Sequence, residues 1–388
     1  MSIVEHIREN INKELALWDQ PSIAVGIVKD GKVVLNEGFG YADVEKQMQS
    51  NADTMYQIGS CSKAFTAAAA ALLVDQGKLE WDKPVHEYMP WLEFQDPYTT
   101  LNVTVRDLLC HRTGLPRHDA YWINGPCTRR EMAENLRNMQ PVWSFRSHWC
   151  YQNTCFVAAG LLIEELSGMT WEEFVQGNIL KPLGMDRTTF YVDAIKADPN
   201  HATPYSRVLP TDLSGYEAID FLKSDCEDMS KGIGAPYGPA GSIMSTINDM
   251  CKWVQFNLDN GKVDGKQIIS EENMKEVHKA NMLMSEPLLL PFPEEDFYSY
   301  GMGWFVETYR GHVMVEHGGN IDGFSALVTM IPDMQLGIVC LTNFNNSFNT
   351  YASTNDILDL YMEVQDGDWH NRWRKIIGDL FASEPEKM

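Results

Sequence analysis

Apolar residues recur four positions apart at the start of the chain, at Ile3, Ile7, Ile11 and Leu15. That spacing places them on one face of a helix, so the pattern predicts an amphipathic helix over residues 2–18. Two short apolar runs rich in β-forming residues follow at 22–28 and 32–41, and Lys29-Asp30-Gly31 separates them. A turn sequence between two such runs predicts a β-hairpin.

Residues 60 to about 300 show a different pattern, in which helical segments alternate with long loops. Predicted helices begin near Ser60, Thr104, Thr128, Thr154, Thr170 and Thr246. After Thr104 and after Thr170, an acidic residue follows three positions later, which is the signature of a capping box. The region 190–240 is rich in Pro, Gly, Asp and Ser, and we expect it to form loops.

β-rich segments return near Gly301, at 302–308, 313–316, 324–331 and 336–343, and a helix is expected over 350–363. Strands at both ends with helices between them indicate an α+β fold, in which an antiparallel β-sheet flanked by helices carries an inserted all-α lobe. We expect a single catalytic unit, residues 1–388, in two lobes with a cleft between them. The α/β lobe takes about 1–59 and 301–365, the helical lobe about 60–300, and 366–388 forms a C-terminal tail.

The helix that starts at Ser60 carries the first candidate chemistry. Ser60 and Lys63 form the only Ser-x-x-Lys in the chain, and alanines fill positions 67–71. Small residues all round predict a buried helix, and the three-residue spacing puts both side chains on one face. Burial lowers the pKa of a lysine, and the neutral amine could then take the proton of the Ser60 hydroxyl. The alternative is a serine cap with a surface lysine, so the motif needs partners elsewhere.

Two further motifs could supply those partners. Tyr151-Gln152-Asn153 lies in the loop before the helix at Thr154. A phenol can relay protons, and an amide can orient a carbonyl or hold an ammonium group. His317-Gly318-Gly319-Asn320 follows a strand predicted to end at Glu316, and glycines at a strand edge let a ligand approach the backbone. Taken singly, the two motifs could equally be a turn and a loop with a surface histidine.

The composition limits the partners. The chain has 31 Lys+Arg against 54 Asp+Glu, a net charge of −23, which argues against nucleic acid and anionic membranes. No signal-peptide pattern or membrane-spanning apolar stretch is present, so we expect a cytoplasmic protein whose eight scattered cysteines are free thiols. A metal site at His148, Cys150 and Cys155 lacks a second ligand pair, and neither metal nor cofactor is expected.

Ser-x-x-Lys, Tyr-x-Asn and His-x-Gly occur once each, in this order. In this the chain resembles the serine β-lactamase and penicillin-binding-protein superfamily, in particular its esterase and D-aminopeptidase branch close to class C β-lactamases. The segments 108–116 and 239–242 match as well, and the resemblance covers about residues 5–362. It implies a β-lactamase/transpeptidase-like fold and an acyl-enzyme mechanism without metal or cofactor.

The resemblance also implies a role for each motif residue. The catalytic residues are Ser60 as nucleophile, Lys63 as its base, Tyr151 as proton relay and His317 of the third motif. Asn153, Gly318 and Gly319 bind the substrate, and the backbone N–H groups of Ser60 and Asn320 form the oxyanion hole.

The third motif departs from the family pattern, because His317 stands where β-lactamases and D,D-peptidases have lysine. A histidine is mostly neutral at pH 7, which disfavours β-lactam hydrolysis and favours substrates without the carboxylate that lysine binds. If the protonated ring binds an anionic group, kcat/KM for an anionic substrate should fall as the pH rises through about 6.5. In longer relatives a segment like 368–377 leads toward a further domain, and we expect any gating by such a domain to be absent or to come from another subunit.

We predict a serine hydrolase that cleaves an ester, amide or D-amino-acid peptide through an acyl-enzyme at Ser60, on a small-molecule or short-peptide substrate. An acyltransferase on the same fold stays open, because the sequence does not show which nucleophile deacylates the enzyme, and so does a β-lactamase. A non-catalytic penicillin-binding sensor or scaffold fits less well, because Ser60, Lys63 and Tyr151 are intact and no membrane segment is present. The oligomeric state is open, and an oligomer is compatible with the sequence.

Overall fold

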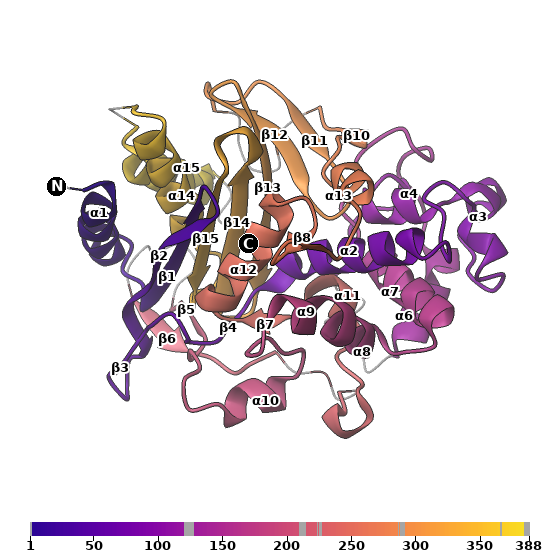
Figure 1. Cartoon of the computed structure of the whole chain (residues 1–388), viewed down its shortest axis with the longest axis horizontal. Helices are drawn as coiled ribbons and strands as arrows, with labels where there is room; N and C mark the ends of the chain where they lie inside the picture. The colour runs from indigo at the N-terminus through magenta and orange to yellow at the C-terminus, as the bar shows by residue number, and fades with distance from the viewer. Residues whose placement is uncertain are drawn as a thin grey trace.

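One antiparallel sheet of nine strands runs through the part of the chain that the computed structural model describes (Figure 1). The described residues are 2–119, 128–208, 215–222, 224, 227–285, 287, 292–364 and 367–383. The strand order is β10-β11-β12-β13-β14-β15-β1-β2-β3. Strand β1 pairs with β15, with Ala24 opposite Leu341, so the two ends of the chain close the sheet. This confirms the predicted α+β fold with an antiparallel sheet flanked by helices.

The strands of the sheet come from both ends of the sequence. From the N-terminal part come β1 (Ser22–Lys29), β2 (Lys32–Asp43) and β3 (Met48–Gln49). From the C-terminal part come β10 (Met282–Leu283), β11 (Tyr298–Tyr300), β12 (Phe305–Tyr309), β13 (His312–Ile321), β14 (Phe324–Ile331) and β15 (Leu336–Thr342). Strands β10 and β11 precede the lobe boundary expected at residue 301. Strands of two and three residues give no periodic signal in the sequence, so the expected boundary lay too late in the chain.

Among the described residues, three small strand pairs lie outside this sheet. They join β4 (Tyr56–Gln57) to β7 (Met244–Ser245), β5 (Tyr205–Arg207) to β6 (Tyr216–Ala218), and β8 (Lys262–Val263) to β9 (Lys266–Gln267). The region 190–240, which we expected to be loop, therefore contains the pair β5–β6, and it also holds the short helices α10 (Val192–Ala197) and α11 (Gly238–Gly241).

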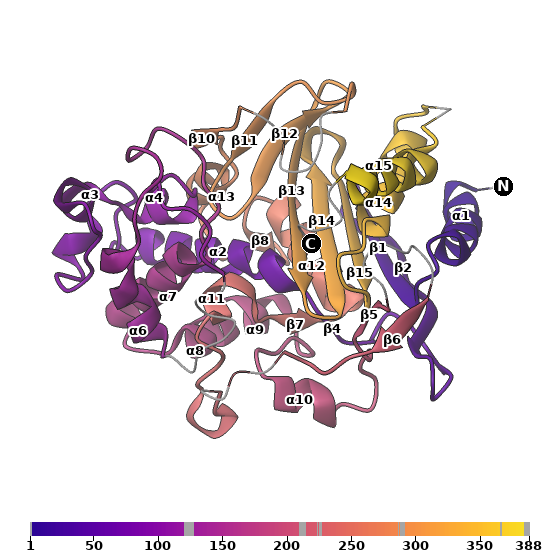
Figure 2. The same ribbon diagram turned by 180° about the vertical axis from the view of Figure 1, so that it is seen from behind.

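Helices from both ends of the chain lie together against the sheet (Figure 2), namely α1 (Ile3–Leu17), α14 (Asn349–Tyr361) and α15 (Trp369–Ser383). Of the apolar face predicted for α1, Ile7 and Ile11 are buried, whereas Ile3 is exposed. The two buried residues share a core with Trp369 and Trp373 of α15. The described part of the C-terminal tail therefore forms a helix, α15, that packs on the rest of the molecule.

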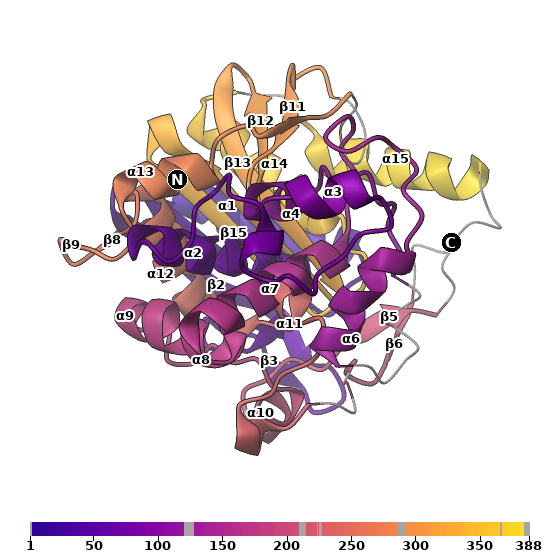
Figure 3. The same cartoon turned by 90° about the vertical axis from the view of Figure 1, so that its right-hand side faces the viewer.

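The remaining helices gather beside the sheet, on the right in Figure 1 and toward the viewer in Figure 3. A 3₁₀ turn, η1 (Gly59–Cys61), leads into α2 (Ser62–Asp75). The others are α3 (Pro97–Asn102), α4 (Val105–Leu109), α6 (Arg129–Glu134), α7 (Asn153–Ser167), α8 (Trp171–Val175), α9 (Lys181–Leu183) and α13 (Glu271–Val277). Helix α12 (Ile247–Leu258) differs from these, because it packs on strands β1 and β15 although its sequence lies inside the expected helical lobe.

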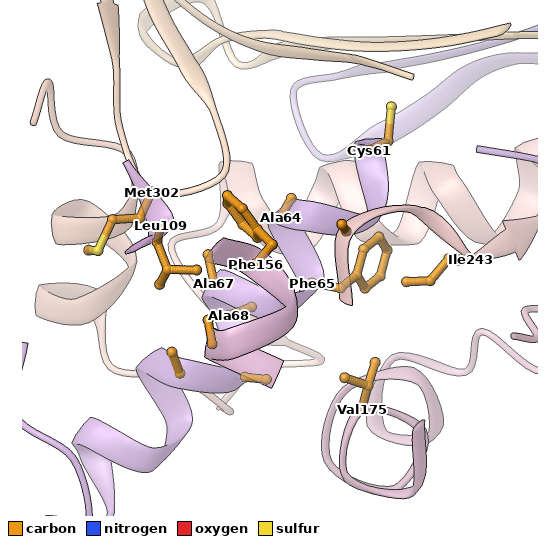
Figure 4. Packing of buried hydrophobic residues seen from close by; sticks show 14 of the residues in the cluster. Cys61, Ala64, Phe65, Ala67, Ala68, Leu109, Phe156, Val175, Ile243 and Met302 are labelled. Atoms are coloured by element: carbon orange, nitrogen blue, oxygen red, sulfur yellow. The ribbon is translucent and has the colours of Figure 1, made fainter. Parts of the chain in front are cut away.

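Helix α2 is the central element of the largest core, as its alanine run predicted. Every residue from Ser62 to Leu73 is buried. The small side chains of Ala64, Ala67 and Ala68 leave room for Phe156 of α7 (Figure 4). On another side, Phe65 stacks on Trp253 of α12 with ring centroids 3.9 Å apart. Because α12 packs on the sheet, α2 is held at a fixed position relative to it.

Candidate active site

The side chains of Lys63 and Tyr151, from two of the sequence motifs, both contact the hydroxyl of Ser60. The Nζ atom of Lys63 lies 3.0 Å from Ser60 Oγ, and the Tyr151 hydroxyl lies 2.8 Å from the same oxygen. Ser60 belongs to the 3₁₀ turn η1 and Lys63 to the first turn of α2, whereas Tyr151 stands in the loop directly before α7. The structure therefore brings the Ser-x-x-Lys and Tyr-x-Asn motifs into one hydrogen-bonded group.

Lys63 is buried, and its surroundings disfavour the ammonium form. Burial is the main cause that brings the pKa of Lys63 well below its usual range, and the positive charge of Arg117 lowers it further. The amine also donates a hydrogen bond of 2.7 Å to the carbonyl oxygen of Ala240. Burial acts in the other direction on Tyr151, where it raises the pKa of the phenol. The site thus places an amine whose neutral form burial favours and a phenol whose protonated form burial favours around one serine.

Helix α11 holds the carbonyl that binds Lys63. The hydroxyl of Thr66 donates to the carbonyl of Pro239, and the N–H of Ile243 donates to the hydroxyl of Ser62. A Cβ built on Gly160 of α7 would lie 2.2 Å from the ring of Pro239, so only glycine leaves room for this proline. These contacts on both sides of Ala240 fix α11 against α2 and α7.

The third motif lies inside a strand, which corrects the prediction that the strand ends at Glu316. Strand β13 continues to Ile321, and Gly319 is paired with Ala326 of β14. A Cβ on Gly319 would lie 2.0 Å from the carbonyl oxygen of Ile58 and 3.1 Å from the amide nitrogen of Ser60. The glycine therefore lets β13 run directly against η1. The sequence did not reveal this, because glycines usually weaken a strand.

The amide nitrogens proposed for the oxyanion hole come from these two adjacent backbone segments. Gly59 has a φ of +49°, and a Cβ built there would lie 2.9 Å from the amide nitrogen of Asn320. The thiol of Cys61 donates to the carbonyl oxygen of His317 at 3.1 Å and joins η1 to β13 at a second point. The backbone at Asn320 is thus held beside that of Ser60.

His317 is buried, and its surroundings disfavour the protonated ring on which the pH dependence expected from the sequence rests. Its Nδ1 lies 2.6 Å from the carbonyl oxygen of Gly318, so Nδ1 carries the proton. Its Nε2 then accepts the hydroxyl of Tyr300 at 2.8 Å, and Tyr151 is no hydrogen-bond partner of the ring. Burial lowers the pKa of His317 to about 3, with a further contribution from Lys63. The ring therefore stays neutral at pH 6.5 and cannot act there as a cation.

Asn153 lies beside the serine but binds a residue that the sequence did not single out. Its side-chain N–H donates to Asp119 Oδ1 at 2.8 Å. Its Oδ1 is buried, and it has no hydrogen-bond partner among the described residues. Asp119 in turn accepts the Nε–H of Arg117. The guanidinium of Arg117 lies over the Tyr151 ring, 4.9 Å from its centroid.

His111 is a second residue near the serine to which the sequence gave no role. The carbonyl of His111 accepts the N–H of Cys150 at 2.8 Å, and its Nδ1 accepts the N–H of Gln152 at 3.1 Å. His111 therefore fixes the backbone on both sides of Tyr151. The matching segment 108–116 was the available signal, but it gave no contact partner.

Two adjoining cavities, of about 240 and 250 Å³, share Ser60, Arg117, Asn320 and Asn346 as lining residues. We call the first the Asn153 cavity, whose lining also includes Asp119, Tyr237 and Asp322. We call the second the His317 cavity, whose lining also includes Tyr151, Phe305, Gly318 and Tyr351. Ser60 therefore lines both cavities, and each of the three motifs contributes at least one lining residue.

Within the described ranges, no helix is long and apolar enough to cross a membrane. The described residues also contain no cluster of three or more His, Cys, Asp or Glu arranged to hold a metal ion.

Two curated relatives are similar over most of this chain. An unguisins hydrolase of Aspergillus campestris is 28% identical over 382 residues, which cover 94% of this chain and 67% of that protein. Protein flp of Staphylococcus aureus strain MW2 is 27% identical and covers 89% of this chain and 63% of its own length. This chain spans about two thirds of the length of these relatives.

Two solved structures share the fold. The octameric penicillin-binding protein homologue from Pyrococcus abyssi has a TM-score of 0.78 and 25% identity, with 93% of this chain and 78% of that chain covered. The D-amino acid amidase from Ochrobactrum anthropi SV3 has a TM-score of 0.71 and 20% identity, with 93% and 99% covered. The sequence model of the family described as Beta-lactamase matches residues 10–361. The chain therefore belongs to the beta-lactamase family, as its three motifs indicated.

Proposed function

We propose that this chain is a serine hydrolase that cleaves an ester, an amide or a D-amino-acid peptide through an acyl-enzyme at Ser60. The observation that carries the proposal is the hydrogen-bonded group of Ser60, Lys63 and Tyr151 beside two cavities. The family and the hydrolase among its relatives support the broad class. A serine becomes a nucleophile when a neighbouring base takes its proton, and a buried lysine in the neutral form can be that base.

The proposed starting arrangement places the protons around Ser60. Lys63 Nζ donates to the carbonyl of Ala240 and lies 3.0 Å from Ser60 Oγ, so the lone pair of the neutral amine can accept the hydroxyl proton of Ser60. The Tyr151 hydroxyl, which burial keeps protonated, donates to Ser60 Oγ. In this arrangement the free lone pair of Oγ can face the carbonyl carbon of a substrate.

Acylation then follows from this starting arrangement. The bond from Ser60 Oγ to the carbonyl carbon forms as the hydroxyl proton passes to Lys63. The carbonyl oxygen becomes an oxyanion, and the backbone N–H groups of Ser60 and Asn320 stabilise it. Loss of one such donor usually raises the activation free energy by about 3–4 kcal/mol. When the bond to the leaving group breaks, Tyr151 gives that group its proton and regains one from the Lys63 ammonium.

Deacylation uses the same residues with water as the nucleophile. Lys63, neutral again after acylation, takes a proton from the water as its oxygen attacks the acyl carbon. The ester bond to Ser60 breaks, and Oγ takes back a proton. The unpartnered Oδ1 of Asn153 suits an N–H group on the acyl part of the substrate, because a buried acceptor without a donor is unfavourable.

The test compares wild type with Ser60→Ala on p-nitrophenyl esters, D- and L-aminoacyl p-nitroanilides and nitrocefin. We expect wild type to turn over at least one of the esters or anilides faster than nitrocefin, and Ser60→Ala to lose that activity. A fluorophosphonate probe should add its mass to the peptide that contains Ser60, and the exposed Ser230→Ala serves as the matched control. Unchanged turnover or unchanged labelling in Ser60→Ala would refute the proposal.

A further inference from the structure

Arg117 places a positive charge at the boundary between the two cavities. It is the only cationic side chain among the described residues that line either of them. Its side chain is 58% exposed, so the charge is accessible from the cavity space. In the His317 cavity, no other lining residue in the described part of the chain carries a charge at neutral pH, because His317 itself is neutral there.

The guanidinium has an edge available for a ligand. Its Nε–H donates to Asp119, and no hydrogen bond joins either Nη atom to another described residue. Asp119 is held in place by the side-chain N–H of Asn153. The pair of Nη donors therefore has a fixed orientation, while Asp119 offsets part of the charge.

A planar guanidinium with two free N–H groups binds a carboxylate through two parallel hydrogen bonds. The position of Arg117 also indicates the side of the substrate to which that carboxylate belongs. Arg117 lies over the ring of Tyr151, which in the proposed mechanism gives its proton to the leaving group. A carboxylate at Arg117 is therefore close to the departing part of the substrate rather than to the acyl part.

We propose that Arg117 binds a carboxylate on the leaving group, so that the preferred substrates are acyl-amino acids or peptides in which the scissile amide is the last one before a free C-terminal carboxylate. The inference rests on the proposed acyl-enzyme function and names its substrate class. Arg117 then supplies the cation that the third motif lacks, because His317 is neutral and hydrogen-bonded to Tyr300. The family motif alone, with histidine in place of lysine, suggested the opposite preference.

Binding to Ser60→Ala tests this without turnover. The probes are N-benzoylglycyl-D-alanine, its L-alanine isomer and the C-terminal carboxamide of each, and calorimetry measures the Kd of every probe. We expect at least one carboxylate to bind about tenfold or more tightly than its carboxamide, as a charge-assisted bidentate contact would give. Ser60→Ala with Arg117→Gln should lose this preference, Arg117→Lys should keep part of it, and the exposed Arg137→Gln should keep all of it.

Higher salt should weaken the preference, since the guanidinium is partly exposed. A preference that survives Arg117→Gln, equal affinity for both members of each pair, or binding of none of the probes overturns the inference. These outcomes are separate from the acyl-enzyme test, because they are read on a variant without the nucleophile. If the fluorophosphonate does not label Ser60, the proposed function fails whatever the probes show.

Discussion

The imidazole of His111 packs against the phenol of Tyr151, with ring centroids 4.3 Å apart. The same histidine accepts the backbone N–H groups of Cys150 and Gln152, so Tyr151 is fixed through both of its neighbours as well as through its ring. Because Gln152 donates to Nδ1, the proton of the neutral ring is on Nε2, which has no acceptor among the described residues. His111 positions Tyr151 without touching Ser60.

We therefore expect His111→Ala to lower kcat by about 10- to 100-fold with a smaller change in KM, because misplacing a catalytic group by about 1 Å can cost that much. His111→Asn should retain more activity, since asparagine offers an acceptor and tolerates the φ of +57° found at this position. Steady-state kinetics on one ester measures both effects, and the exposed His6→Ala is the control. Wild-type kcat in His111→Ala would contradict the positioning role.

Lys63→Arg should lower kcat by about 10³-fold, because arginine keeps the charge but cannot act as a base. In wild type, kcat/KM should rise with pH as Lys63 loses its proton, and this limb should lie well below the usual pKa of lysine, since burial and Arg117 both lower the pKa. Arg117→Gln removes one of these causes and should move the limb to higher pH. A loss under tenfold in Lys63→Arg, or a limb that Arg117→Gln does not move, would contradict this assignment.

The local part of the site could be predicted from the sequence, whereas its tertiary part could not. Ser60 and Lys63 are three residues apart at a helix start, and their 3.0 Å contact follows from helix geometry alone. That both ends of the chain join one antiparallel sheet followed from the β-rich runs there, whereas the pairing of β1 with β15 did not. The partners of His317, Asn153 and Tyr151 depend on which loops the fold brings together, and neither spacing nor composition encodes that. Tyr300, the partner of His317, belongs to β11, a strand of three residues that is too short to leave a pattern.

Gly319→Ala tests the close approach of β13 to the serine. The added Cβ would lie 2.0 Å from the carbonyl of Ile58, so the strand or η1 must shift. We expect a loss of about 100-fold in kcat, as for a displaced oxyanion-hole donor, and a loss of about 1–3 kcal/mol in the free energy of unfolding. Kinetics and urea denaturation measure the two. Gly177→Ala is the matched control, because nothing lies within 4 Å of its Cβ position, and equal behaviour of the two variants would show that the approach is unimportant.

The last prediction concerns the protonation of the buried His317, for which the sequence suggested a pKa near 6.5 and the structure a much lower one. The pKa of His317 is lowered to about 3, so the unfolded chain binds a proton at this residue below about pH 6.5 and the folded chain does not. The free energy of unfolding should therefore decrease as the pH falls from 6.5 toward 4.5, and His317 should contribute up to about 1.4 kcal/mol per pH unit. His317→Gln should remove that contribution, and urea denaturation at several pH values measures the difference in slope.

Because His317 does not titrate near neutral pH, kcat/KM for a carboxylate substrate should show no inflection from this residue between pH 5.5 and 7.5. His317→Lys should not increase activity toward carboxylates, since it would place an ammonium at a site only 2% exposed and remove the acceptor of Tyr300. An inflection near pH 6.5 that disappears in His317→Gln would show instead that the ring is protonated in the working enzyme. The cation for an anionic substrate would then be His317, and the selectivity assigned to Arg117 would have to be divided between them.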